Sequence, residues 1–462
     1  MNTPVFYDVS LPDASGRRHF ERHSAGVLRA FNLRAAQKGA LDLPVVLEKD
    51  TLRILEVMPP VLSREGRPIV VDRNGNQVEV GSARLMTTGT PVLLDVNGRE
   101  IQGPRALLPR EIERKLARLD GFDKSELVQK IVLDNQLFGF LDLFGNFPPT
   151  EQGQADGGVL MAQNGSLVYY SLMVNNVFAL YRTMLGTSVP AGTKFPITQA
   201  ELDDVTTFAS DNGMAPVIDS EALAIEIKTS WVEAAGLGPD ASKFIQMKAI
   251  VPTYDTSNPD DWVPNGTKTV TLAMVGMHIV GSVKGHPEML WATFEHLSNA
   301  PAAEYKYTKT PSGSTTINQD TTGDWVFCAN GSAGPFNQAH MAMVSDHIKS
   351  ISPFHIGPID VLRTRPWGLP GSSANGNAEV ISINNTVRAL LDPADVRRNY
   401  FHEGTTWTIG GAAPSGVNQV GTNKLENATM ETFMQGANCF DCHITNTTAV
   451  SHVFDETDPL QF

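Results

Sequence analysis

The chain is 462 residues long and has little cysteine, little basic charge and no long apolar run. No stretch approaches the ~20 consecutive apolar residues that a membrane-spanning helix needs, so we expect no membrane span. Lysine and arginine number 36 against 50 aspartates and glutamates, and the net charge of −14 disfavours nucleic acid and anionic membranes as partners. With 41% hydrophobic residues the chain can bury a large core, so we expect a globular protein.

Two of the three cysteines stand together near the C-terminus, in the stretch NCFDCH at residues 438–443. Cys439 and Cys442 are separated by two residues, and His443 follows directly. With so few cysteines, such a C-x-x-C-H string arises by chance in about one of three thousand sequences of this composition. In this string each thiol can add to one vinyl group of a haem while the histidine binds the iron. The motif therefore predicts one covalent haem c per chain, with His443 as the proximal iron ligand.

Two other interpretations of the motif stay open at this point. Zinc takes the same sulfur and nitrogen donors, so Cys439, Cys442 and His443 would then hold a structural zinc ion together with Cys328 or another histidine, in a non-redox binding protein. A C-x-x-C pair also serves as a redox dithiol, although no neighbouring βαβ pattern supplies that context. If Cys328 takes no part, we expect it to be a buried free thiol.

The second face of a haem iron needs a ligand from elsewhere in the chain. In small single-domain cytochromes c a methionine downstream of the motif supplies it, but no methionine follows His443, which excludes that fold. The most apolar stretch, residues 270–299, contains His278 and His296, which we take as the first candidates for a second ligand or for haem-pocket residues. The other candidates are histidines and methionines of this or a later segment: Met277, His286, Met289, His340, Met341, Met343, His347 and His452.

Glu226 and Lys228 form a charged pair in an otherwise apolar strand pattern. Residues 222–231, ALAIEIKTSW, alternate strictly, which predicts a strand with both charged side chains on one face. We interpret the pair as solvated or structural, with a role in the haem pocket as the alternative.

Short apolar runs broken by Asn-Gly, such as PIVVDRNGNQVEV and PVLLDVNGREI, indicate β-hairpins early in the chain. Residues 109–141 favour helices, and residues 270–299 favour two long strands joined near residues 282–287. Just before the motif, Met430, Phe433 and Met434 predict a short helix that delivers it. Together these patterns predict an α+β, β-rich fold, with a large antiparallel sheet body, short helices and long loops.

The same patterns suggest a division of the chain into three parts. Residues 1–105 form a hairpin-rich N-terminal region, residues 106–150 a helical connector, and residues 151–462 a β-rich haem-binding domain that ends in the motif. Stretches rich in Ser, Thr, Asn, Gly and Pro predict long loops over this last part, at residues 308–324, 368–376 and 410–423.

Several phrases of the sequence resemble bacterial proteins that are generally labelled cytochrome c family proteins and mostly have no assigned function. The phrases occur in the family's order from about residue 156 onward: GGVLMAQNGSLVYYSLMVNN, AIEIKTSW, VGMHIVGSVKGHPEMLWATFEHLSNAP, RRNYFHEGTTWT and LENATMETFMQGANCFDCH. The resemblance implies a mono-haem protein in which Cys439 and Cys442 attach the haem and His443 is an axial ligand. Members of this family usually carry an export leader.

A shorter stretch, CFDCHITNTTAVSHVF, resembles the C-terminal end of the hydroxylamine-oxidising c-type cytochromes, whose haem is cross-linked to a lysine. Those proteins are much smaller, and the similarity covers this stretch alone. It implies a haem enzyme, with Lys228 as a candidate cross-linking residue.

These observations favour a redox haemoprotein of one of two classes. An electron-transfer protein would exchange electrons with a redox partner protein, whereas a haem-dependent oxidoreductase with an open iron face would act on peroxide, nitric oxide or hydroxylamine. Covalent haem attachment normally takes place outside the bacterial cytoplasm, so we expect a periplasmic or otherwise exported protein. The first residues, MNTPVFYDVSLPDASGRRHF, contain no apolar signal segment, so a cytoplasmic location is the alternative.

Overall fold

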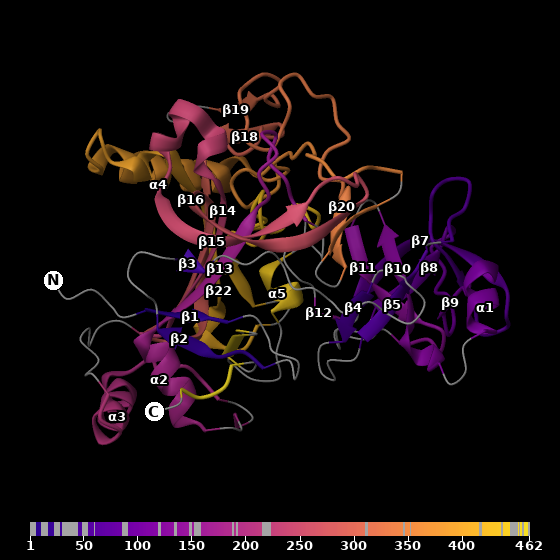
Figure 1. The fold of residues 1–462 in the computed structure, drawn as a ribbon, viewed down its shortest axis with the longest axis horizontal. Helices are drawn as coiled ribbons and strands as arrows, with labels where there is room; N and C mark the ends of the chain where they lie inside the picture. Colours follow the sequence, from indigo (N-terminus) through magenta and orange to yellow (C-terminus); the bar gives the residue numbers. More distant parts are fainter. Residues whose placement is uncertain are drawn as a thin grey trace.

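The computed structural model shows a β-rich protein (Figure 1). Strands account for 38% of it and helices for 20%, and the largest sheet is antiparallel along its main path, so the expected fold class is confirmed. The structure describes residues 6–10, 17–22, 28–29, 45–48, 54–59, 61–85, 91–118, 122–133, 136–146, 150–151, 159–186, 189–190, 193–214, 223–309, 313–344, 347–351, 353–414, 418–435, 438–443, 451, 453–454 and 457–460. Within these ranges no helix is both long and apolar enough to cross a membrane.

One sheet forms the body of the protein and has twelve strands among the described residues. Eight of them follow the order β2-β1-β13-β14-β16-β17-β22-β23, and all neighbours along this path are antiparallel. The path consists of β1 (Phe6–Val9), β2 (Phe20–Arg22), β13 (Tyr169–Asn175), β14 (Ile225–Glu233), β16 (Asp261–Val283), β17 (His286–His296), β22 (Tyr400–Thr408) and β23 (Gln419–Gly421). The strands beside it are β3 (Leu28–Arg29), β15 (Gln246–Asp255), β20 (Met341–Val344) and β21 (His347–Ser350).

The two long strands expected at residues 270–299 are confirmed as β16 and β17, joined by a tight turn. Pairing starts with Val283 opposite His286, and the next pair is Gly281 opposite Leu290, so β17 has two more residues than β16 in between. This irregularity leaves the faces of the strands unchanged but shifts which residues lie opposite one another.

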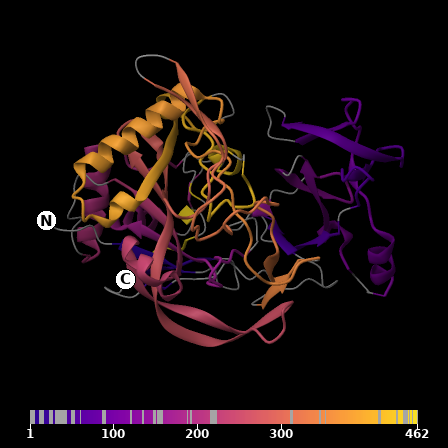
Figure 2. The same cartoon turned by 90° about the horizontal axis from the view of Figure 1, so that it is seen from above.

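Strand β15 and the first part of β16 leave the sheet together as a two-stranded arm (Figure 2). At the far end of the arm Asp261 and Trp262 pair with β21. In a separate small hairpin, β18 (Tyr305–Thr308) ends where the first of the three expected loops begins, and its partner β19 (Ser314–Ile317) lies within that loop. That stretch is therefore partly ordered as strands.

Residues 45–151 contain two smaller sheets that lie to one side of the body in both views (Figures 1 and 2). The first has the order β11-β10-β5-β4-β12 and the second β8-β7-β6-β9, and a shared apolar core includes Met58, Val80 and Leu127. Their strands are β4 (Val45–Glu48), β5 (Ile54–Met58), β6 (Ile69–Val71), β7 (Gln77–Leu85), β8 (Pro91–Asp95), β9 (Arg105–Ala106), β10 (Leu127–Leu133), β11 (Gln136–Asp142) and β12 (Thr150–Glu151). Both predicted Asn-Gly turns, at residues 74–75 and 97–98, are present. The division of the chain into residues 1–105, 106–150 and 151–462 stays a prediction.

The helices expected at residues 109–141 are wrong for most of that stretch. The α-helix described there is α1 (Arg110–Leu116), followed by a 3-10 turn, η1 (Lys124–Glu126). The following residues form β10 and β11, because β10 pairs with β11 on one side and with β5 on the other. Local sequence favoured a helix, but pairing with a distant strand outweighs such a weak preference.

The longer helices cover the body of the protein. Helices α2 (Asn176–Met184) and α3 (Gln199–Asp211) pack on a core that also contains Trp291 and Phe440, and α4 (Ala374–Leu390) lies along the sheet near β22 (Figure 2). Short 3-10 segments are η3 (Ala234–Lys243), η4 (Val396–Asn399) and η5 (Ile409–Gly411).

The short helix expected at residues 430–434 is wrong. The N–H groups of Met430 and Glu431 both donate to the carbonyl of Asn427, and the segment continues as turns. The helical turn nearest the motif is α5 (Cys439–Cys442), which contains both cysteines. Residues 430–434 form hydrogen bonds with the sheet, described below, in place of the hydrogen bonds within a helix.

Candidate functional site

The centre of the sheet carries a row of polar side chains on one face. Lys228 on β14 lies opposite His278 on β16, and His278 lies opposite Thr293 on β17. Opposite residues of antiparallel strands share a face, and so do residues two apart along a strand. Glu226, two residues before Lys228, and Trp291, two residues before Thr293, therefore lie on the same face. Two segments that the sequence singled out separately therefore form one surface.

Residues 425–435, here called the C-terminal strap, cross this face of the sheet. The Tyr170 hydroxyl on β13 donates to the Thr429 carbonyl at 2.6 Å. The Asn427 side-chain amide donates to the Phe294 carbonyl on β17 at 3.1 Å. The strap thus spans several strands before the chain reaches the motif.

Gly276 on β16 allows the strap to come this close. A Cβ atom there would lie 2.6 Å from Ser230 Oγ and 2.7 Å from both Asn427 Oδ1 and Thr429 Oγ1. The Ser230 and Thr429 hydroxyl oxygens are themselves hydrogen-bonded at 2.6 Å. A side chain at this position would therefore break a buried polar contact as well as push the strap away.

We expect Gly276→Ala to lower the free energy of unfolding by about 2 kcal/mol, because the buried groups must move apart to admit a methyl group. Gly357→Ala is the matched control, since a Cβ atom at Gly357 meets nothing within 4 Å, and its change should stay within about 0.5 kcal/mol. Urea denaturation of both variants measures the difference. Equal stabilities would contradict the close approach of the strap.

Glu431 on the strap binds His278 with both of its carboxylate oxygens. Each oxygen lies 3.1 Å from His278 Nε2, while His278 Nδ1 lies 2.8 Å from Thr293 Oγ1. Burial alone would raise the pKa of Glu431, but His278, Lys228 and the Asn427 N–H together hold that pKa below its usual value. Glu431 is therefore an ionised carboxylate, and both ring nitrogens of His278 have partners.

Lys228 interacts electrostatically with Glu431 of this pair and with Cys439 of the motif. Burial lowers the pKa of Lys228, while Glu431, Glu226 and the Cys439 thiol act in the opposite direction. Glu226 in turn accepts a 2.6 Å hydrogen bond from the Ser451 hydroxyl. The Lys228 amine is thus within electrostatic range of the strap carboxylate and of the first motif cysteine, so Glu226 and Lys228 are parts of an interior polar cluster rather than a solvated strand face.

The motif itself rests on Trp291. The His443 N–H donates to the Cys439 carbonyl at 2.9 Å, which closes one helical turn and puts the two residues on the same side of it. The His443 ring centroid lies 4.3 Å from that of Trp291, and the buried Phe440 ring meets Trp291 edge-on at 6.0 Å. Cys442 ends α5, and its side chain lies outside the described part of the chain.

His296 lies on the opposite face of β17 from the strap. Its ring stacks on Phe244 with 3.6 Å between centroids, its Nε2 donates to the Lys243 carbonyl, and its Nδ1 accepts from the Ser298 N–H. Burial lowers the pKa of His296 to about 4, so the ring is neutral. The structure therefore does not bring His296 to the motif, and His296 is not placed to bind an iron held by His443.

Among the other candidate ligands, Met289 is buried in the same apolar cluster as Trp291 and Phe440. His452 lies outside the described residues. The remaining candidates pack or bond elsewhere: Met277, Met341 and Met343 with the cluster around Trp231, His286 with Glu288, His340 with Phe354, and His347 with Asp261.

Cys328 is buried, as the sequence suggested, and lies away from the motif. Its Sγ is 3.6 Å from the Ala329 carbonyl oxygen, and burial together with Asp360 raises its pKa to about 12. Among the residues described, no three His, Cys, Asp or Glu side chains form a group that would hold a metal ion. The structure thus does not bring Cys328 to Cys439 and His443.

A second buried polar cluster holds the start of the strap. Glu295 on β17 accepts a hydrogen bond from the Ala428 N–H with one oxygen, and its other oxygen lies 2.8 Å from Arg363 Nε. Arg363 also donates to the carbonyls of His296 and Leu297. One buried guanidinium therefore ties two strand-end carbonyls to the carboxylate that fixes the strap.

Two further carboxyl groups are buried beside this ion pair. Glu403 on β22 is 1% exposed, and Glu426 on the strap lies 3.8 Å from Arg365. Burial, and then the neighbouring Glu295, raise the pKa of Glu403 well above its usual value, and Arg363 opposes this only in part. Glu403 therefore keeps its proton over a range of pH in which an exposed glutamate has lost it.

Three members of the site were not predicted from the sequence: Glu431, Thr293 and Ser451. The one signal was Glu431 itself, a single carboxylate within an otherwise uncharged stretch, METFM, that was assigned to a packed helix. Thr293 carried no signal, because its contact with His278 depends on the irregular register of the hairpin.

No known protein family, curated protein or solved structure matches this chain. The resemblance to bacterial cytochrome c family proteins therefore stays a prediction. Functional conclusions depend on the site itself, in which the motif turn lies on Trp291 and the cluster of Lys228, His278 and Glu431 lies on the same face.

Proposed function

We propose that the protein is a c-type cytochrome with one covalently attached haem and that it acts as a redox haemoprotein. The observation that carries this proposal is the α5 turn, which sets Cys439 and His443 on one side and holds the His443 ring against Trp291. The donor types fit the group, because two thiols match two vinyl groups and an imidazole matches the iron. When bound, haem supplies one-electron redox chemistry at its iron.

The surroundings of α5 also suit a large apolar ring system. Phe440, Trp291 and Met289 belong to one buried cluster, together with Phe454. A haem needs apolar walls of this kind with a few aimed polar groups. The apolar cluster supplies the walls and the strap supplies the polar groups.

In this proposal the residues of the site have distinct roles. Cys439 and Cys442 hold the haem, and His443 binds the iron, with its ring oriented by Trp291. The Glu431 carboxylate and the Lys228 amine set the charge near the haem and hence its reduction potential.

Production of the protein with an export leader, in a bacterium that attaches haem outside its cytoplasm, tests the proposal. We expect one haem per chain that survives acid-acetone extraction and a haem-sized mass increase on the peptide that contains Cys439 and Cys442. Cys442→Ala should leave at most one thioether link, whereas the control Cys328→Ala should keep the full haem content. Haem that is extracted by acid-acetone, or one zinc ion per chain in elemental analysis, would overturn the proposal.

A haem enzyme with an open iron face is the second candidate, and the placement of two histidines favours it. His278 has partners on both ring nitrogens, and His296 lies on the other face of β17, so neither is ready to bind the iron. Lys228 and Glu431 are groups of the kind that move protons for a small substrate such as peroxide, nitric oxide or hydroxylamine.

Carbon monoxide binding to the reduced protein separates the two candidates. Rapid binding indicates an open iron face and an enzyme, whereas no binding indicates two protein ligands and an electron carrier with a redox partner protein. The mass of the peptide that contains Lys228 shows in the same sample whether this lysine is linked to haem. Because haem attachment implies export, fractionation of the native host should place the protein in the periplasm rather than the cytoplasm.

A further inference from the structure

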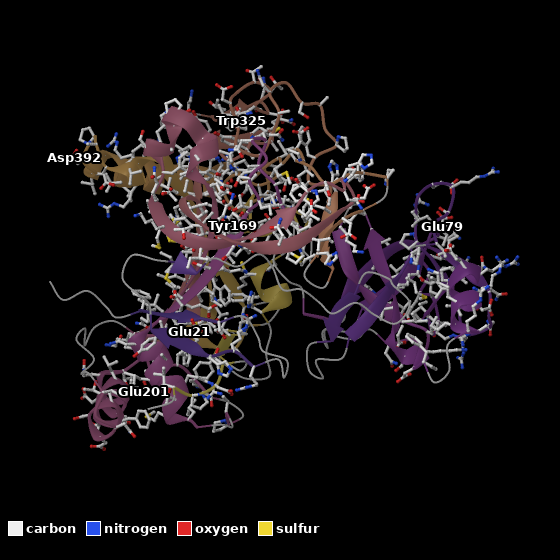
Figure 3. The ribbon with its side chains drawn as sticks, viewed as in Figure 1. Glu21, Glu79, Tyr169, Glu201, Trp325 and Asp392 are labelled. Carbon is white, nitrogen blue, oxygen red and sulfur yellow. The ribbon has the colours of Figure 1, made fainter. Side chains whose placement is uncertain are left out.

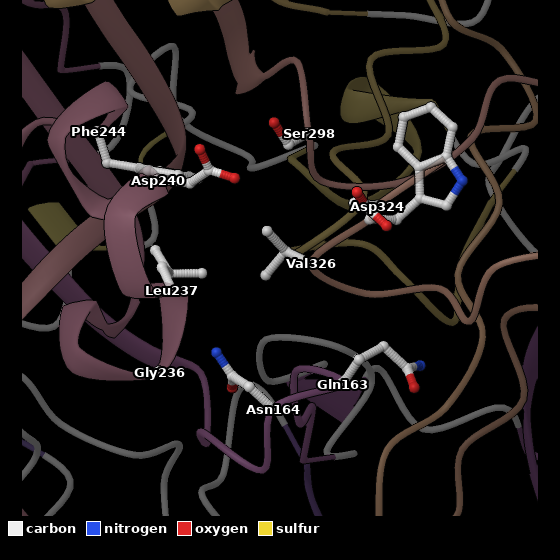
Figure 4. Close-up of a pocket in the computed structure, with 10 residues that line it drawn as sticks. Gln163, Asn164, Gly236, Leu237, Asp240, Phe244, Ser298, Asp324 and Val326 are labelled. Atoms are coloured by element: carbon white, nitrogen blue, oxygen red, sulfur yellow. The ribbon is translucent and has the colours of Figure 1, made fainter. Parts of the chain in front are cut away.

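We infer that a cleft apart from the motif binds a small organic ammonium compound. The cleft lies between η3, the turn at Asn164 and residues 324–326, and has a volume of about 220 Å³ (Figure 4). That volume equals about seven water molecules, enough for a compact organic group. Trp325, one of its lining residues, lies at the upper edge of the body in Figure 3, well away from α5 in Figure 1.

The floor of the cleft is apolar. Phe244 and Val326 are 4% and 8% exposed, and Leu237 completes the lining at this level. Phe244 rests on the His296 ring, and because burial lowers the pKa of His296 to about 4, this ring adds no positive charge beneath the floor. A ligand that reaches the floor therefore needs an apolar body.

The rim of the cleft is acidic. Asp240 and Asp324, both exposed, lie on different sides of the opening, with Ser298 between them in the view of Figure 4. Asp240 Oδ1 pairs with Lys243 Nζ at 2.7 Å, so the three charged side chains leave one net negative charge at the rim. A compact cation with an apolar body matches both the floor and the rim, and an anion does not.

Two walls of the cleft are fixed before any ligand arrives. A Cβ atom at Gly236 would lie 2.8 Å from Asn164 Cγ, and one at Gly323 would lie 2.6 Å from Trp325 Cζ2, so each glycine makes room for a lining side chain. Asn164 Oδ1 also accepts a 3.0 Å hydrogen bond from the Ser166 N–H. Side chains that are already ordered lose little conformational entropy when a ligand binds.

Choline is a suitable probe, and 3,3-dimethyl-1-butanol, which has the same shape without the charge, is its matched control. We expect choline to bind the full-length protein with a Kd of roughly 1 mM, and the neutral alcohol at least about tenfold more weakly. Saturation-transfer NMR on the methyl signals of each compound measures both. Binding of the two compounds with equal affinity, or of methyl glucoside in place of choline, would overturn the proposal.

Substitutions at the rim test whether choline binds in the cleft. Asp324→Asn and Asp240→Asn should each weaken choline binding by about fivefold, because each removes one carboxylate charge from the rim. Asp211→Asn, on exposed α3, is the control that changes the net charge equally and should leave binding unchanged. The same loss in all three variants would show non-specific attraction to an acidic protein and would refute the site. Circular dichroism confirms that each variant is folded.

Discussion

Arg363→Met is expected to lower the free energy of unfolding by about 3–5 kcal/mol. Arg363 is 7% exposed, and its guanidinium is 2.8 Å from the fully buried Glu295. Methionine keeps much of the volume but removes the charge, so the buried Glu295 would lose its ion-pair partner. Two carbonyls at the end of β17 would also lose their donor. Urea denaturation at pH 7 measures the loss.

The matched control is Arg397→Met, which removes an ion pair at the surface. Arg397 lies 2.5 Å from Asp395 but is 66% exposed, so we expect its loss to change the stability far less than the loss of Arg363. The double variant Arg363→Met, Glu295→Gln should recover part of the stability, because it removes both buried charges together. If Arg363→Met and Arg397→Met proved equally mild, the buried ion pair would not hold the strap.

Glu403→Gln should change how stability depends on pH. Burial and Glu295 raise the pKa of Glu403 in the folded protein well above 4.5, so the folded state keeps a proton that the unfolded state has already released. Stability from this group is therefore full below pH 4.5 and is lost as the pH rises towards the raised pKa, by about 1.4 kcal/mol per pH unit for one proton.

Glutamine cannot ionise, so Glu403→Gln should remove this pH-dependent loss and be more stable than the natural protein at the alkaline end of the range. Urea denaturation between pH 4.5 and 9 shows the two profiles diverge as the pH rises. Glu379→Gln, on the exposed side of α4, is the control and should leave the profile unchanged. Parallel profiles for the natural protein and Glu403→Gln would mean that Glu403 is ionised throughout.

The parts of the fold that the sequence predicted correctly depend on local patterns. Asn-Gly turns lie where their sequence indicated them, and strict alternation marked β14. The stretch that became β10 was predicted as helix, because its pairing with β5 joins residues about 70 positions apart and leaves no trace in local periodicity. Likewise, the strap was predicted as a helix although hydrogen bonds from β13 and β14 determine its path.

The candidate site also depends on contacts between distant residues, which local sequence patterns do not reveal. The motif was visible because its three residues lie within residues 439–443, whereas the His278–Glu431 contact joins residues 153 positions apart. The hairpin register adds a further obstacle. If the pairing of Val283 with His286 continued regularly, Trp291 would lie opposite His278, but the two extra residues in β17 place Thr293 there. The side chains around His278 were therefore not predictable from turn position and strand length.

The strap also has a consequence for the order in which the protein folds. Its contacts reach far back along the chain: Tyr170 and Thr429 are 259 positions apart, and His278 and Glu431 are 153 positions apart. Such non-local contacts form slowly and only after the strands that they join are paired. During synthesis the sheet can therefore assemble with its central face open, and the strap and motif close over that face as a late step. Under the proposed function, this order would leave the motif open to haem attachment until the rest of the sheet is complete.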